Sequence, residues 1–224
     1  MKINKELAEV TGVILGDGCL SEYYVKSEQR RRQEIAFTGS NEDFLYYKEF
    51  VRPVFIKFFG TKGRLFIRKD DNSTRFHVIN KPVFEFFHSM GLPSGKKPSY
   101  LKIPNKIMKK QCLSLACVRG IWNTDGSIYR RFTKRYPSQK KFYGNYLVMQ
   151  LKMNTKPLLT QVKKILNVAD IGTTSITKEN KAFVLRITKQ TSISRYLTTI
   201  GFSNKHHSNR IKSFNIPATV KFFS

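Results

Sequence analysis

The sequence predicts an α+β fold made of two pseudo-symmetric halves, each with the element order αββαββα. Three observations predict it. Along the 224 residues, segments whose apolar residues have helical spacing are followed by segments whose apolar residues have strand-like spacing. The same order of elements occurs twice, at an offset of 108 residues. Two corresponding segments end in Asp-Gly, at Asp17-Gly18 and Asp125-Gly126. The offset is too long for a solenoid and fits a duplicated domain, so we place the halves at residues 1–102 and 103–224.

The first half is expected to open with a helix over residues 4–16, with Asn4 as its N-cap. Strands follow over residues 19–26 and 33–38. The next helix starts near Asn41 and reaches residue 59, with a bend at Pro53. A hairpin over residues 62–80, a short helix over 82–90 and a Gly/Pro/Lys loop over 91–100 complete this half.

The second half repeats that order, beginning with a helix over residues 104–124. Strands are expected over residues 127–132 and 145–153. A helix over 155–166, a hairpin over 171–189, a helix over 192–200 and a loop over 201–211 follow. A basic loop separates the first two strands and contains Lys134, Arg135, Lys140 and Lys141.

The charge of the chain predicts a polyanionic partner. There are 41 Lys+Arg against 15 Asp+Glu, which gives a net charge of +26, and residues 86–169 contain 17 basic residues with Asp125 as the single acid. A solvated surface normally mixes both signs, so this stretch indicates phosphate contact. A generic basic surface is the plain alternative. An anionic membrane is a weaker one, because no long amphipathic helix presents the basic residues.

Composition excludes several other classes of protein. Forty per cent of the residues are hydrophobic, which excludes disorder as the main state. No apolar run is long enough to span a membrane, and the first residues lack the apolar region of a signal peptide, so we expect a cytoplasmic protein. The three cysteines have no CxxC spacing, which argues against a zinc knuckle and a disulfide scaffold.

The two Asp-Gly segments are expected to meet. Each follows an apolar helix with small residues one turn apart, at Gly12 and Gly16 in the first copy and at Gly120 and Thr124 in the second. Small residues at this spacing let two helix backbones approach closely. If the two helices pack together, their C-terminal ends bring Asp17 and Asp125 to the symmetry axis.

Two carboxylates placed there predict a divalent cation. Each would lie at the negative end of a helix dipole and near the other, which disfavours ionisation unless a cation is bound. Oxygen ligands favour Mg²⁺, with Mn²⁺ or Ca²⁺ as substitutes for binding, and such a metal can activate water beside a phosphodiester. The plain alternative for each Asp-Gly is a helix C-cap and turn. Two copies at corresponding positions, Asp17 and Asp125, favour the metal.

These segments, VTGVILGDG and VRGIWNTDG, resemble the two motifs of the monomeric LAGLIDADG homing endonucleases. The loop GLPSGKK, followed by LKIP, also resembles intron- and intein-encoded members of that family. The resemblance implies motif helices at the interface and a saddle-shaped antiparallel sheet in each half that enters the major groove. It also implies that Asp17 and Asp125 bind Mg²⁺, helped by the carbonyl groups of Gly16 and Thr124, and that both strands are cut to leave a staggered break.

The family also implies further catalytic residues, which transfer less directly. Members usually carry a polar residue, often Gln, at the end of the second strand of each half, and Ser40 and Asn154 are the candidates here. A basic residue commonly supports the active-site solvent. Lys97 and Lys205 each follow their motif aspartate by 80 residues and form the best pair. Simple phosphate contact or solvent exposure remains an even alternative for both lysines.

The outward faces of the strands are expected to read bases in the major groove. Alternation with the core residues turns one set of mostly polar side chains outward. Phosphate contact uses many of the same side chains and is the alternative for each of them. The candidates are Arg32, Glu34, Arg64, Arg68, Arg75, His77, Tyr129, Arg131, Gln150, Lys152 and Arg186.

The sequence therefore favours a site-specific endonuclease that binds a long, asymmetric double-stranded DNA target as a monomer. An RNA-splicing maturase with the same fold is the main alternative, and its own intron RNA is then a further partner. The intact aspartates, Asp17 and Asp125, favour cleavage over that alternative. A DNA-binding regulator of the same fold is expected to add a helix-turn-helix segment, and the 13 residues after Ile211 leave no room for one.

Overall fold

Residues 2–133 and 142–214 are described by the computed structural model of the chain. The basic loop that the sequence analysis places at Lys134, Arg135, Lys140 and Lys141 lies outside them. Within the described residues, no helix is both long enough and apolar enough to cross a membrane.

The first half contains a four-stranded antiparallel sheet with strand order β1-β2-β4-β3. The α2–α3 segment is continuous and includes a π-helical turn over Tyr47–Val51, just before Pro53 in the first turn of α3. Proline has no N–H to give to the preceding turn, which accounts for a wider turn just before the position where a bend was predicted. The elements are α1 (Lys5–Gly16), β1 (Gly18–Val25), β2 (Arg30–Ser40), α2 (Phe44–Tyr46), α3 (Arg52–Phe59), β3 (Arg64–Arg68), β4 (Ser73–Ile79) and α4 (Lys81–Ser89).

The second half repeats the arrangement, with strand order β5-β6-β8-β7. The predicted fold of two αββαββα halves is confirmed at the level of these two matching sheets and their helices. The elements are α5 (Asn105–Met108), α6 (Gln111–Asp125), β5 (Gly126–Thr133), β6 (Phe142–Met153), α7 (Lys156–Val168), β7 (Thr177–Glu179), β8 (Ala182–Ile187), α8 (Gln190–Thr199) and α9 (Lys205–Ser213).

Two predictions of secondary structure were wrong. The helix expected over residues 104–124 is divided into α5 and α6, and the hydroxyl of Ser114 bonds to the carbonyl oxygens of Ile107 and Lys110 at the break. The loop expected over residues 201–211 contains α9, which begins after an Asn204 cap. His207 and Ile211, one turn apart on α9, are both buried, so packing holds this helix in place.

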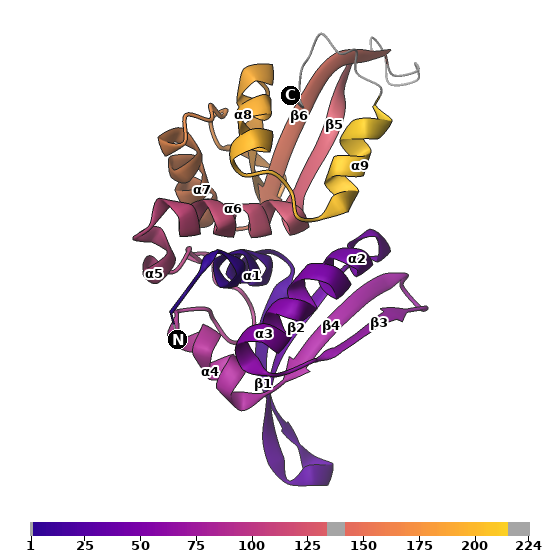
Figure 1. Ribbon diagram of the computed structural model, residues 1–224, viewed down its shortest axis with the longest axis vertical. Helices are drawn as coiled ribbons and strands as arrows, with labels where there is room; N and C mark the ends of the chain where they lie inside the picture. Colours follow the sequence, from indigo (N-terminus) through magenta and orange to yellow (C-terminus); the bar gives the residue numbers. More distant parts are fainter. Residues whose placement is uncertain (1, 134–141, 215–224) are drawn as a thin grey trace.

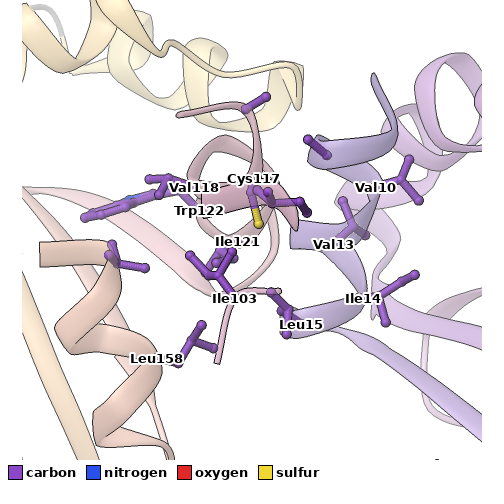
Figure 2. Packing of buried hydrophobic residues seen from close by; sticks show 14 of the residues in the cluster. Val10, Val13, Ile14, Leu15, Ile103, Cys117, Val118, Ile121, Trp122 and Leu158 are labelled. Atoms are coloured by element: carbon purple, nitrogen blue, oxygen red, sulfur yellow. The ribbon is translucent and has the colours of Figure 1, made fainter. Parts of the chain in front are cut away.

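The motif helices α1 and α6 lie side by side between the two halves (Figure 1). A Cβ added at Gly12 would lie 2.1 Å from the carbonyl oxygen of Cys117, and one added at Gly120 would lie 2.0 Å from that of Glu9. Glycine is therefore required at both crossing points. The close packing predicted from the small residues is confirmed, and Figure 2 shows Val13, Cys117 and neighbouring apolar residues filling the interface.

The helices cover one face of each sheet and leave the other face polar. In the first half, Phe37 and Phe76 point to the core and are fully buried. In the second half, Met149 and Leu185 do the same. The side chains between them along each strand point to the opposite face, as alternation in a strand requires. Both halves therefore present a sheet face that none of the described helices covers, called the uncovered face below, and this face carries the predicted DNA-contacting residues.

Candidate active site and nucleic-acid interface

The motif aspartates lie at the C-terminal ends of α1 and α6. Asp17 follows α1 as its C-cap, and Asp125 is the last residue of α6. A Cβ added at Gly16 would lie 2.8 Å from Asp125 Oδ2, so this carboxylate lies against the backbone of the other motif helix. Asp17 Oδ2 accepts a hydrogen bond of 3.2 Å from the hydroxyl of Tyr47. The close helix packing thus brings both acids to one place, each with different neighbours.

Burial raises the pKa of both acids, and repulsion from neighbouring carboxylates adds to this effect at Asp17. Burial, followed by the negative charges of Asp125 and Asp43, raises the pKa of Asp17 from 3.8 to about 7. Burial also raises the pKa of Asp125 from 3.8 to about 6, and the positive charge of Lys97 opposes that rise. A bound cation would remove this cost, because it favours the ionised form of both carboxyl groups.

Lys97, one of the two lysines proposed from the sequence spacing, lies close to the aspartates. Its Nζ donates to the carbonyl oxygen of Leu15 at 2.9 Å and also to that of Gly16. Burial lowers the pKa of Lys97, and the charges of Asp125 and Asp17 act against that effect. The Gly16 carbonyl, a predicted metal ligand, therefore already accepts a hydrogen bond from this ammonium group.

Lys97 and Asp125 line a cleft of about 550 Å³ that opens beside the motif helices. Gly16, Asn154 and Lys152 line it as well. Asn154 lies at the end of the second strand of its half, where the sequence analysis expected a polar catalytic residue. The structure thus brings Asn154 into the same cleft as Asp125 and Lys97.

The other predicted catalytic residues are placed differently. Lys205 begins α9 and pairs with Glu49 at 2.8 Å, rather than contacting a motif aspartate. Its side chain is 70% exposed, so equal sequence spacing does not give it the position of Lys97. Ser40 lies at the end of β2, and both its backbone N–H and its hydroxyl donate to Asp43 Oδ2 at 2.8 Å. This capping box already uses the hydroxyl that was predicted to serve catalysis.

Asp43 and Tyr47 are site residues that the sequence analysis missed. A Cβ at Gly39 would lie 2.7 Å from both Asp43 Oδ2 and the Tyr47 hydroxyl, and 3.3 Å from Asp17 Oδ2. These three polar groups therefore converge on Gly39. Ser40 and Asp43 have the spacing of a capping box ahead of an apolar run, and that signal could have located Asp43 beside the motif.

The uncovered sheet face of the first half carries a connected set of polar side chains. Glu34 is 5% exposed, and its carboxylate accepts from Tyr23 at 3.1 Å, Arg75 at 3.1 Å and His77 at 2.7 Å. Glu34 was predicted to contact a base directly. Burial and three protein donors engage its oxygens, so its position favours holding its neighbours over contacting a base. Arg64 is exposed on the edge strand of the same face.

The remaining candidates in the first half already form ion pairs. Arg32 donates through Nε to Glu28 at 3.0 Å, and Arg68 pairs with Asp70 at 2.7 Å. Both pairs are at least partly exposed, so they are weak and a phosphate can compete for the guanidinium groups.

The second half has a corresponding set on its own uncovered face. Gln150 Oε1 accepts from Tyr129 at 3.3 Å and from Arg186 Nε at 2.9 Å. Arg186 also pairs with Glu179 at 2.5 Å. Arg131 and Lys152 are exposed on the same strands. The candidates predicted here therefore share one surface, and three of them are already hydrogen-bonded to one another.

The residues present suit a hard divalent cation shared with a substrate. Among residues 2–133 and 142–214, no three His, Cys, Asp or Glu side chains are grouped so that they could hold a metal ion by themselves. Asp17 and Asp125 instead supply two oxygen donors with raised pKa values. Mg²⁺ is typically held by one or two carboxylates, with water and substrate phosphates completing its shell. Two aspartates beside a phosphate-binding surface therefore fit.

Comparison with known proteins identifies the class of fold. Residues 113–201 match the LAGLIDADG-like domain family. I-DmoI in complex with DNA and Mn is similar over 88% of this chain and 96% of that chain, with 20% identity and a TM-score of 0.63. I-AabMI bound to uncleaved DNA is similar over 98% of this chain and 97% of that chain, with 13% identity and a TM-score of 0.58. A double mutant of I-SmaMI is similar over 94% and 90%, with 13% identity and a TM-score of 0.60.

The chain thus has the single-chain, two-motif LAGLIDADG fold, in which two halves meet through their motif helices. Most of its second half matches the LAGLIDADG-like domain family. The resemblance found in VTGVILGDG and VRGIWNTDG is confirmed.

Proposed function

We propose that this protein is a site-specific DNA endonuclease that cuts both strands of a long, asymmetric duplex and leaves a staggered break. One observation carries the proposal: two carboxylates, Asp17 and Asp125, meet at the ends of paired helices between two uncovered polar sheet faces. The net charge of +26 supports a polyanionic substrate. The DNA complexes of I-DmoI and I-AabMI, which share the fold, support duplex DNA as that substrate.

The residues of the site have separable roles in this proposal. Asp17 and Asp125 would hold Mg²⁺, which supplies activation of water and stabilisation of the leaving oxygen when bound. Lys97 holds the end of α1 through the Leu15 and Gly16 carbonyls, and its charge favours the ionised form of Asp125. Asn154 lines the same cleft and can orient water or phosphate there. The two halves, residues 1–102 and 103–224, would each bind one half-site within a monomer.

A randomised duplex library, incubated with and without Mg²⁺, tests this function. Staggered cuts at one long sequence, only when Mg²⁺ is present, are the expected result. Asp17→Asn and Asp125→Asn should each abolish double-strand cleavage while leaving target binding largely intact. Glu85→Gln on α4 is the matched control, because the Glu85 side chain is 56% exposed and pairs with Lys81, so this variant should cleave normally. Full cleavage by either motif variant would refute the metal assignment.

Binding without cleavage would point to another activity. If the wild-type chain binds duplexes but makes no cuts in Mg²⁺, the RNA-splicing maturase becomes the better explanation. Footprinting of the chain on structured intron RNA then tests the alternative directly.

A further inference from the structure

Each half carries a triad of Tyr, hydrogen-bond acceptor and Arg on its uncovered sheet face. In the first half the triad is Tyr23 on β1, Glu34 on β2 and Arg75 on β4. Its acceptor is the buried Glu34 carboxylate, whereas the Arg75 side chain is 35% exposed. Glu34 therefore positions the other two groups, and the tyrosine and arginine are the ones that can reach a ligand.

The second half has a matching triad in which only the acceptor residue is of a different type. Tyr129 on β5 and Arg186 on β8 both donate to Gln150 on β6. An uncharged amide thus replaces the carboxylate of the first half. Arg186 keeps a charge partner in Glu179, which supplies the negative charge that Gln150 lacks.

The tyrosine and the acceptor have the same cross-strand geometry in both halves. Ser21 lies opposite Glu34, and Tyr23 lies two residues farther along β1. Ser127 lies opposite Gln150, and Tyr129 likewise lies two residues farther along β5. In each half the tyrosine therefore crosses diagonally to its acceptor, and the shared geometry is not a chance feature of one sheet.

The two triads are not at equal distances from the motif aspartates. Tyr23 is six residues past Asp17, whereas Tyr129 is four residues past Asp125. The acceptors are displaced in the same sense. Gly18 and Gly126, which follow the aspartates, pair with Phe37 and Leu151. Glu34 precedes the first of these partners by three residues, and Gln150 precedes the second by one.

The third strand does not share that displacement. His77 on β4 lies opposite Ala36 of β2, and Arg186 on β8 lies opposite Gln150 of β6, so His77 has the strand position that corresponds to Arg186. Arg75 lies opposite Thr38, two residues nearer the motif end, and its guanidinium reaches back to the displaced Glu34 carboxylate. His77 is held by Glu34 and packs edge-on against Phe66 with ring centroids 5.9 Å apart. Its Nε2 atom is buried without a partner among the described residues, so His77 supports the triad rather than contacting a ligand.

From the displacement of the tyrosine and the acceptor we propose that the two halves read base pairs at unequal distances from the cleavage site. Two residues of strand span about 7 Å, and one base pair rises about 3.4 Å along the duplex. Because each guanidinium is held at its acceptor, and Glu34 lies two residues farther from the motif end than Gln150, the Arg75 triad reads a base pair about two positions farther from the centre than the Arg186 triad. Each guanidinium favours guanine, whose O6 and N7 accept both of its hydrogen bonds. This inference rests on the proposed DNA-binding function.

Affinity for single-base variants of the selected target tests the proposal, with Ca²⁺ in place of Mg²⁺. Arg75→Ala should lose discrimination of roughly 5- to 150-fold at one base pair of one half-site. Arg186→Ala should lose it at one base pair of the other half-site, about two positions nearer the centre. Arg195→Ala on α8 is the matched control, because Arg195 is half exposed, pairs with the largely exposed Asp170 and lies outside the sheets. It should keep the full base preference.

Variants of Glu34 and Gln150 test whether these acceptors position the arginines or only stabilise the fold. Glu34→Gln should retain the base preference of its half, because Gln150 already performs this role with an amide. Glu34→Leu should lose the preference at the same base pair as Arg75→Ala. In the other half-site, Gln150→Glu should likewise retain the base preference. Gln150→Leu should lose it at the same base pair as Arg186→Ala. Thermal melting checks that each variant is folded, and if Glu34→Leu is not, Arg75→Ala decides.

Three results would overturn the proposal. One is that Arg75→Ala and Arg186→Ala affect base pairs equally far from the centre. The second is that folded Glu34→Leu and Gln150→Leu keep full discrimination. The third is a wild-type chain that prefers no duplex, which removes the proposed function as well. In the first two cases the target is still selected and cut. The proposed endonuclease function is then supported, whereas the proposal about which base pairs the two triads read is refuted.

Discussion

Replacing Arg119 with methionine tests the buried ion pair that joins the two halves. Glu9 on α1 is fully buried, and its carboxylate accepts from Arg119 Nε at 2.7 Å and from Arg119 Nη2 at 2.6 Å. Tyr46 and Asn123 donate to its other oxygen at 3.0 and 3.1 Å. Arg119→Met leaves this carboxylate with two neutral donors and no positive charge. We expect a large loss of stability, because burying an unpaired charge is costly.

The size of the loss follows from the burial of the two partners. Breaking a buried pair costs about 3–5 kcal/mol. The Arg119 side chain is 29% exposed, so water already weakens the attraction and the lower end of that range applies. A loss of about 3 kcal/mol corresponds to a fall in Tm of roughly 6–12 °C for a chain of this size. Glu6→Gln is the matched control on the same helix, because Glu6 pairs with an exposed Lys57 and its loss should cost about 0–1 kcal/mol.

Urea unfolding, followed by the fluorescence of the single tryptophan, measures these losses. Trp122 is fully buried on α6 and its ring packs against Tyr196 of α8, so its emission reports on unfolding of the second-half core that includes α6. The double variant Glu9→Met/Arg119→Met removes both charges and should be at least about 1 kcal/mol more stable than Arg119→Met alone. The reasoning fails if Arg119→Met costs no more than Glu6→Gln, or if the double variant is the less stable one.

Three further outcomes are expected. Gly120→Ala should strongly lower Tm, because its Cβ would lie 2.0 Å from a backbone oxygen, whereas Gly172→Ala, 3.2 Å from a side-chain hydroxyl, should change it little. Without metal, Asp17→Asn should be more stable than wild type at pH 8 by a few kcal/mol, and equal near pH 4, in melts with EDTA. Because the folded pKa of Asp17 is raised from 3.8 to about 7, its stabilising protonated form is lost as the pH rises through that range. DNA affinity should fall steeply between roughly 50 and 200 mM salt in titrations, and a flat response would contradict phosphate-dominated binding.

The duplication made much of the fold predictable. Small residues at Gly12 and Gly120 predicted the helix crossing, and the structure places a backbone carbonyl oxygen from the other helix against each of them. Alternation within the strands predicted which side chains leave the core, such as Arg75 and Arg186. Such features depend on local periodicity and repetition, and a sequence displays both directly.

Features set by tertiary contacts were less predictable. Lys97 and Lys205 have the same spacing from their aspartates. Only Lys97, however, contacts the C-terminal end of its motif helix, whereas Lys205 pairs with Glu49. The helix α9 redirects Lys205 towards Glu49, and the burial of His207 that holds α9 in place is a packing effect. The burial of Glu34 likewise depends on three donors from other strands. Contacts of this kind join residues that are far apart in the chain, and no local pattern in one sequence predicts them.

The buried Glu9–Arg119 ion pair also favours packing of the two halves within one chain over packing between two copies of the chain. By the repeat offset, the position of Glu9 on α1 corresponds to that of Cys117 on α6, which is fully buried and uncharged. Pairing two α6 helices from different copies would therefore place Arg119 beside Cys117, with no carboxylate in reach. Pairing two α1 helices would bury two Glu9 carboxylates with no guanidinium. Each wrong pairing leaves a buried charge unpaired, which disfavours it by several kcal/mol.

The Glu9→Met/Arg119→Met variant turns this argument into a prediction about assembly. It removes the charges that distinguish the correct pairing, while Gly12 and Gly120 still allow any two motif helices to cross closely. Sedimentation at high protein concentration should therefore show monomers for the wild-type chain and a measurable fraction of dimers for the double variant. Dimers in the wild type, or none in the variant, would mean that shape and linkage alone decide which motif helices meet.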